Sequence, residues 1–294
     1  MEHMTKKLLA LAIFLMMCSC NGSRSGSDQP IVTVSIPPFR YFVEKIGGHD
    51  FEVNVMVPAG SNPHIYEPVP AQIDKLSKSK AYISNGFLGF EQTWLNRFYE
   101  INKTMVRLSL GDNIDPIISK HDHEGTHAEG ADPHYWVSPK CAMKMASAVK
   151  GLLCDLNPQD GKMYESNYDS LMSVIEGVDR LAREMFSEDD GSSFMIYHPN
   201  LAYLARDYGL EEISVEFEGK EPPPSRLKEL IDLARERKIK TIFVQKEYDT
   251  KNAKAIAGEI GADLEIIDPL SADWYISTVD IITALHNSIE KSKN

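Results

Sequence analysis

IVTVSIPPFRYFVEKIGG, residues 31–48, combines two kinds of hydrophobic pattern in one short stretch. The run 31–36 is mostly apolar and rich in β-branched residues, as in a buried strand. A Pro-Pro turn follows, and an apolar helix pattern over 39–46 then ends at two glycines. The stretch therefore predicts a strand that leads directly into a helix, which is the building unit of a parallel α/β sheet.

The same unit occurs again in FMIYHPNLAYLARDYG, residues 194–209, as an apolar strand, a His-Pro turn and a helix that ends at glycine. Downstream, the strand patterns at 53–57 and 213–217 each run into a proline-rich loop, and a helix that starts with proline follows in each copy. Two copies of one β-α repeat predict two Rossmann-like parallel-sheet lobes, over residues 31–156 and 189–294.

The segment between the lobes, residues 157–188, carries apolar side chains at three- and four-residue spacing. It predicts one long helix of about 30 residues, which at about 1.5 Å per residue would extend roughly 45 Å. A helix of that length would run along both lobes and join them rigidly. The alternative is an ordinary surface helix that is broken near Gly177.

Four residues, each next to a proline, fall at or beyond the carboxyl ends of the predicted strands. These residues are His64, His134, His198 and Asp268. This edge of a parallel α/β sheet is where ligands bind. Each lobe contributes two of the four, so we expect them to meet in the cleft between the lobes. Three imidazoles and one carboxylate would complete a tetrahedral Zn²⁺ shell. A histidine taken singly would not justify this prediction, because the residue is common outside metal sites.

A polar segment before His134, residues 119–131, contains three further histidines, His121, His123 and His127. Within it, HEGTH matches the HExxH motif of zinc proteases. That motif requires a helix that places both histidines on one face, whereas this segment has no apolar periodicity and predicts a loop. It is interpreted either as a secondary metal-capture site or as an inert loop.

The N-terminus has the features of an export signal. Two lysines precede an apolar run over 8–17, which is too short to span a bilayer, so residues 1–19 are predicted to be a signal peptide. Cys20 follows a small serine, resembles the lipidated cysteine of a bacterial lipoprotein, and begins a polar tether over 20–30. We expect an exported, lipid-anchored protein on the periplasmic side or cell surface. A cleaved secretory peptide with incidental cysteines is the alternative.

Charge and cysteine usage limit the possible partners and cross-links. The formal net charge of −12 argues against nucleic acid as a partner. Cys141 and Cys154 lie on one predicted helix, where 13 residues would separate them by roughly 20 Å. A disulfide needs Cα atoms within about 7 Å. Both cysteines are therefore expected to be small buried residues.

Four ordered segments, PHIYEP (63–68), DPHYWVSP (132–139), YHPNLAYLARDYGL (197–210) and IDPL (267–270), resemble the motifs of the zinc- and manganese-binding receptors of bacterial ABC importers, the cluster A-I family. The resemblance extends over residues 31–294. It implies a monomeric receptor that captures a metal ion in its cleft and passes it to a membrane permease, without catalysing a reaction. Two lobes joined by a rigid helix are the implied fold.

The resemblance also implies the ligands and the metal. His64, His134, His198 and Asp268 match the family's ligand positions, and Glu67 is a possible accessory ligand. At the third position zinc receptors have histidine and manganese receptors have glutamate, in keeping with the preference of Zn²⁺ for imidazole. His198 therefore favours zinc. The motif around it lacks the family's usual acidic residue, so no hydrogen-bond acceptor for the histidines is predicted.

The sequence leaves open three alternatives to a zinc receptor. A manganese or iron receptor of the same family would use the same cage. An exported zinc hydrolase would need an open coordination position and a nearby base, which four protein ligands disfavour. A surface adhesin with a structural metal would unfold when the metal is removed.

Overall fold

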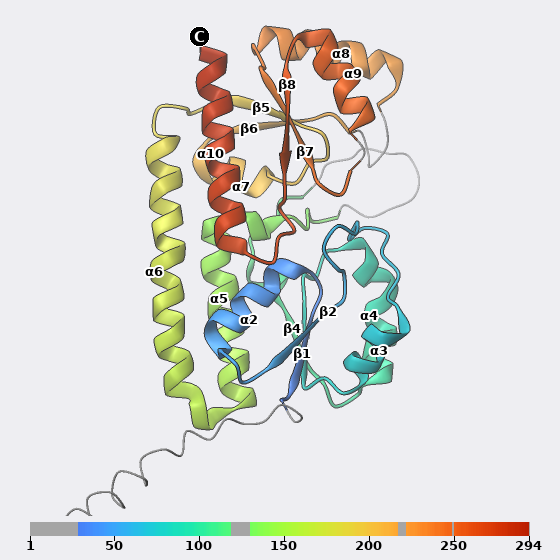
Figure 1. The fold of residues 1–294 in the computed structure, drawn as a ribbon, viewed down its shortest axis with the longest axis vertical. Coiled ribbons are helices and arrows are strands. Elements are labelled where there is room, and N and C mark those ends of the chain that lie inside the picture. Colours follow the sequence, from blue (N-terminus) through green and yellow to red (C-terminus); the bar gives the residue numbers. More distant parts are fainter. Residues whose placement is uncertain (1–28, 119–129, 217–221, 249, 294) are drawn as a thin grey trace, which may run out of the picture.

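The computed structural model describes residues 29–118, 130–216, 222–248 and 250–293. It contains two four-stranded parallel sheets, one in each half of the chain (Figure 1). The strand orders are β2-β1-β3-β4 and β6-β5-β7-β8, so the second half repeats the topology of the first. The predicted α/β fold with two repeated lobes is confirmed.

The first lobe is formed by seven strands and helices in alternation, and the second repeats that alternation. The first contains β1 (Ile31–Val34), α2 (Pro37–Gly47), β2 (Glu52–Val55), α3 (Pro70–Ser77), β3 (Ala81–Ser84), α4 (Gly89–Ile101) and β4 (Val106–Ser109). The second contains β5 (Ser193–Ile196), α7 (Ala202–Tyr208), β6 (Glu211–Ser214), α8 (Pro224–Glu236), β7 (Thr241–Gln245), α9 (Lys251–Ile260) and β8 (Asp263–Ile267).

Local sequence explains where these elements begin and end. Proline occupies the first turn of α2, α3 and α8, where its missing N–H breaks no helical hydrogen bond. Helix α7 ends at Gly209, which adopts the left-handed conformation with φ of 74°. Glycine adopts that conformation without the steric penalty that a Cβ atom brings.

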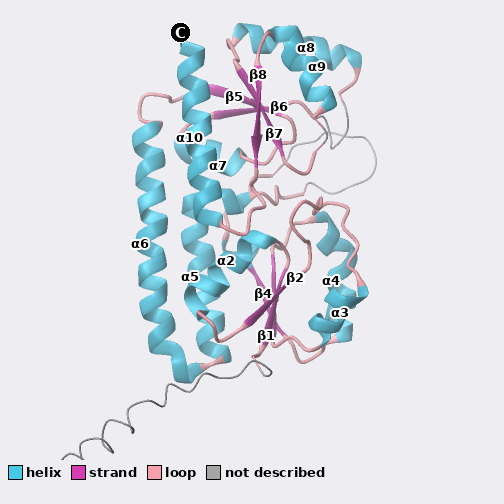
Figure 2. Cartoon of the chain, in the orientation of Figure 1, coloured by secondary structure: helices cyan, strands magenta, loops and turns pink. Residues whose placement is uncertain are grey.

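Three long helices lie on one side of the molecule (Figure 2). Helix α5 (Pro139–Leu156) lies beside the first lobe, α10 (Trp274–Lys293) lies mainly beside the second, and α6 (Gly161–Met185) runs along both. Helix α6 has 25 residues and continues through Gly177. It packs against α2 and α5 of the first lobe and against α10 of the second. The expected connecting helix is therefore present, and it contacts both lobes.

The two lobes share a hydrophobic core. One continuous cluster of buried side chains extends from Val32 of β1 through Ile175 of α6 to Phe194 of β5 and Leu285 of α10. A smaller cluster lies between the second sheet and helices α8 and α9. Because the larger cluster contains residues of both lobes, the core does not divide the chain into separate domains. The predicted domain boundaries therefore stay predictions.

Two tryptophans connect the lobes by hydrogen bonds. The Trp136 Nε1–H donates to the Pro269 carbonyl at 2.8 Å, and the Trp274 Nε1–H donates to the Trp136 carbonyl at 2.7 Å. The Trp274 ring also packs against Tyr41 and Phe42 of α2. The loops that face the cleft are thereby anchored to this core.

Two further expectations concern membrane segments and cysteines. Among the described residues, none of the helices has the length and apolarity needed to cross a bilayer. Cys141 and Cys154 both lie on α5 as free thiols. Cys141 is buried as expected, but the prediction is wrong for Cys154, which is only partly buried. The signal peptide 1–19 and Cys20 fall outside the described residues, as do His121, His123 and His127.

Candidate metal centre

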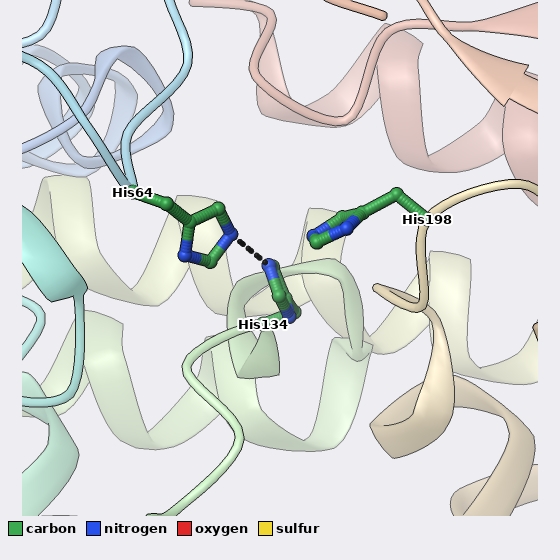
Figure 3. Close-up of side chains that lie close together, drawn as sticks. All are labelled: His64, His134 and His198. Carbon is green, nitrogen blue, oxygen red and sulfur yellow. Dashed lines mark hydrogen bonds between the residues drawn. The ribbon is translucent and has the colours of Figure 1, made fainter. Parts of the chain in front are cut away.

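Three histidines from three different loops converge between the lobes (Figure 3). His64 lies in the loop from β2 to α3, His134 precedes α5, and His198 lies in the turn from β5 to α7. One ring nitrogen of each lies within 4.8 Å of the others. The ring centroids are 5.0 to 5.2 Å apart. The fold therefore brings together three of the four residues predicted as ligands.

The spacing of the His64 and His134 nitrogens matches that in a zinc shell. The Nε2 atoms of His64 and His134 are 3.2 Å apart. A tetrahedral Zn²⁺ with Zn–N distances of about 2.0 to 2.1 Å places its nitrogen ligands about 3.3 Å from each other. The Nε2 atom of His198 is buried and has no hydrogen-bond partner in the part of the chain that the structure describes. A buried nitrogen lone pair that lacks a partner is costly, and a metal ion would satisfy it.

A buried carboxylate fixes the orientation of His134. The Nδ1 atom of this ring lies 2.7 Å from Asp132 Oδ1, and the same oxygen accepts the backbone N–H of His134 at 2.8 Å. Burial opposes the charge on Asp132, but His134 outweighs it and lowers the pKa of Asp132 below its usual value. With Nδ1 as the donor, Nε2 presents its lone pair to the centre.

A second carboxylate does the same for His198. Its Nδ1 atom lies 2.5 Å from Glu216 Oε2, and the Glu216 side chain is 9% exposed. This pairing follows from the register of the sheet, in which Ile196 of β5 lies opposite Ser214 of β6. His198 and Glu216 each lie two residues beyond the end of their strand, where backbone hydrogen bonds from Val215 and Glu216 to Ile196 and Tyr197 continue the pairing. Carboxylates that accept from the far nitrogen of a histidine are typical of zinc sites.

Contacts across the cleft hold His64 next to His198. The backbone N–H of His64 donates to the Asn62 side chain at 2.8 Å. Asn62 also forms a hydrogen bond with the Tyr248 side chain, and the Tyr248 ring stacks on His198 with centroids 4.7 Å apart. Behind His64, a Cβ atom at Gly89 would lie 3.0 Å from the His64 carbonyl oxygen. Glycine at this position allows that close approach.

Burial keeps two of the imidazoles neutral. It lowers the pKa of His64 to about 3, with further lowering by the neighbouring His134 and His198. It also lowers the pKa of His198, although Glu216 opposes that shift. A neutral imidazole is the form that binds a metal ion. At neutral pH these two side chains are therefore ready to act as ligands.

The space at the centre suits an ion. The cavity has a volume of about 10 Å³, far below the roughly 300 to 1,000 Å³ of sites that hold organic ligands. Its lining is largely apolar apart from the histidines and three polar side chains, and it comprises Pro63, His64, His134, Trp136, His198, Asn200, Gln245, Glu247, Tyr248, Pro269 and Leu270.

Asp268, the fourth predicted ligand, lies apart from the histidine group. It directly follows β8, as expected, but its carboxylate is 3.3 Å from Lys246 Nζ and its side chain is 38% exposed. It does not line the pocket of the histidines. Glu67, the expected accessory ligand, is exposed and is likewise outside the group. For these two residues, metal binding stays a prediction.

Comparison with known proteins relates this geometry to a family. The family model described as the periplasmic component A of the zinc-uptake complex, ZnuA, matches residues 32–287. The chain belongs to the ZnuA family. This confirms the resemblance to zinc receptors of ABC importers. A crystal structure of ZnuA is 37% identical, with a TM-score of 0.83 over 89% of this chain and 100% of that one.

Curated relatives of the family are more distant. The zinc-binding lipoprotein AdcA of Streptococcus pneumoniae is 27% identical over 273 residues, which is 89% of this chain and 54% of AdcA. The chain thus spans about half the length of AdcA. The high-affinity zinc uptake protein ZnuA of Bacillus subtilis is 26% identical over 88% of this chain and 86% of its own length.

Proposed function

We propose that this chain is a zinc receptor, which captures Zn²⁺ outside the cytoplasmic membrane and delivers it to the permease of an ABC importer. The observation that carries the proposal is the convergence of His64, His134 and His198, two of which hold their far nitrogens against buried carboxylates. Membership of the ZnuA family supports the same function.

Capture in this site requires no chemical reaction. Zn²⁺ exchanges bound water for three imidazole nitrogens, and the orientations of two of these rings, His134 and His198, are already set by Asp132 and Glu216. The negative charge of those carboxylates strengthens the imidazoles as donors. Because the rings do not have to be reoriented, less conformational entropy is lost on binding. The site therefore favours tight binding of an ion over turnover of a substrate, and we propose that the protein is not an enzyme.

Zinc is proposed as the ion because all three convergent ligands are imidazoles, whereas carboxylate, carbonyl and water ligands suit Mn²⁺. The test is elemental analysis of the purified protein after exposure to equimolar zinc and manganese, repeated on His198→Glu. We expect wild type to contain one zinc, and the variant to shift towards manganese. Wild type that carried manganese in preference to zinc would contradict the proposal.

Attachment to the membrane is a separate proposal. We infer that Cys20 carries a lipid that tethers a monomeric receptor near its permease. Labelling of cells with a fatty-acid analogue should mark the wild-type chain and leave Cys20→Ser unmarked. If the variant stayed in the membrane fraction, the lipid anchor would be wrong, and the zinc site would be unaffected by that result.

A further inference from the structure

Among the described residues, Glu247 is the acidic residue that lines the pocket of the three histidines. Its Oε1 atom is buried and has no hydrogen-bond partner among the described residues. Burial, followed by the nearby charge of Asp268, raises the pKa of this carboxyl above its usual value. Its surroundings thus disfavour the charged form and provide no donor to Oε1. A cation would remedy both.

The backbone around Glu247 is tied to His198. The Gln245 side chain donates from Nε2 to the His198 carbonyl at 2.5 Å, and the Tyr248 ring stacks on the His198 imidazole. A turn closes between them, in which the Tyr248 N–H donates to the Gln245 carbonyl at 3.0 Å. Glu247 therefore lies between two residues that contact a proposed ligand.

The same turn places Lys246 and Glu247 in different environments. The Lys246 side chain is 62% exposed and pairs with Asp268, whereas Glu247 lines the pocket. Among the described residues, Asp268 pairs with a cation, whereas none lies within hydrogen-bonding distance of Glu247 Oε1. A metal ion would have to compete with Lys246 for Asp268, and no such competition exists at the buried oxygen of Glu247.

We propose that Glu247 supplies the carboxylate that completes the shell formed by His64, His134 and His198, and that Asp268 stays paired with Lys246. This inference rests on the proposed function. The Glu247 carboxylate lies outside the 4.8 Å histidine group, so binding requires a change of side-chain rotamer. Glutamate has three rotatable side-chain bonds through which such a change can occur.

The test compares Glu247→Gln with Asp268→Asn in the full chain, since each removes a charge and nearly preserves side-chain size. Zinc affinity is measured by competition with a chromophoric chelator, and Co²⁺ absorption reports the ligand set. We expect Glu247→Gln to weaken zinc binding by about tenfold or more and to change the Co²⁺ spectrum. Asp268→Asn should weaken binding less and preserve the spectrum. Glu259→Gln, on the exposed surface of α9, is the charge-matched control.

The outcomes separate this inference from the proposed function. Glu247→Gln that binds zinc like wild type, with an unchanged Co²⁺ spectrum, would overturn the inference, as would a larger loss in Asp268→Asn. If His198→Ala also bound like wild type, the zinc site itself would be wrong. Circular dichroism and thermal unfolding of the metal-free variants check folding. We expect Glu247→Gln to be at least as stable as wild type, because it removes an uncompensated buried carboxyl.

Discussion

Two groups of side chains in this molecule each bring three potential metal-binding atoms close together, yet the surroundings of the two groups differ. The histidine group lies in the cleft, and the second group, Asp189, His286 and Glu290, lies where the end of α6 meets α10; in each, the ligand atoms are within 4.8 Å of one another. The second group already has a cation, because Lys293 Nζ lies 2.5 Å from Asp189 and 2.7 Å from Glu290.

The histidine group has no such cation. Among the described residues, its pocket is lined by neither lysine nor arginine. Proximity of ligand atoms is therefore not sufficient for a metal site. The difference is that the protein itself already places a cation, Lys293, on the carboxylates of the second group. We accordingly interpret the second group as an ion-pair network that attaches α10 to the end of α6.

The largest expected effect is the loss of a histidine from the cleft. We expect His198→Ala to weaken zinc binding by at least about 100-fold, because one of the few ligands that share roughly 10 to 16 kcal/mol of binding free energy is removed. His286→Ala, in the second group, is the control and should leave zinc affinity unchanged. Chelator competition measures both. Equal losses in the two variants would contradict the distinction between the groups.

The next effect comes from the carboxylate behind His198. Glu216→Gln should weaken zinc binding by about 10- to 100-fold, because the amide no longer enforces the tautomer that presents Nε2 to the ion. Glu211→Gln, at the exposed start of the same strand, should bind like wild type. Titration calorimetry compares the two. An unchanged affinity in Glu216→Gln would show that the orientation of His198 does not depend on this contact.

The pH dependence of binding gives a smaller effect. Protonation competes with zinc, so affinity falls once the pH drops below the pKa of a ligand. Two histidines with the ordinary pKa of about 6.5 would together lose about 100-fold at pH 5.5. Because burial lowers the pKa of His64 to about 3 and also lowers that of His198, we expect that loss to be largely absent. Calorimetry at pH 7.5, 6.5 and 5.5 checks this, and a 100-fold fall would contradict it.

The smallest effect on zinc is expected from Lys293→Met. This change removes the cation from the second group and leaves Asp189, which is 1% exposed, without its compensating charge. We expect Tm to fall by about 3 °C, with zinc affinity changed less than about twofold. Thermal unfolding with and without zinc measures both, and Lys291→Met, two residues away on the exposed surface of α10, is the control. If Lys293→Met bound a second zinc ion, the distinction between the histidine group and the second group would be contradicted.

The fold could be predicted from the sequence because the same strand-turn-helix pattern occurs twice, and each copy supports the interpretation of the other. The strand-turn-helix pattern at 31–48 recurs at 194–209, and the two sheets have the same strand order. The three histidines were predictable for a related reason, since each lies beyond a strand at the edge where parallel sheets bind ligands. Proline next to each of them added a second signal.

The acceptors behind the histidines were not predicted, although one of them had a signal in the sequence. Glu216 lies as far beyond its strand as His198 lies beyond the neighbouring one, so pairing the predicted strands would have placed the two side by side. The environments of Asp268 and Glu247 could not be predicted. Which of two neighbouring acids meets Lys246 depends on the turn after β7 and on side-chain rotamers, which no periodicity encodes.

The core that crosses both lobes has a consequence for how the ion enters and leaves. Swinging the lobes apart would expose the apolar side chains that connect α6, β5 and α10 to the first sheet, so wide separation is strongly opposed. In a zinc receptor, entry and exit of the ion would instead involve the loops that carry the histidines, including the loop in which Asn62 contacts Tyr248. The stiffness of those loops would then set the residence time of the ion, and a permease would hasten release by loosening a few loop contacts.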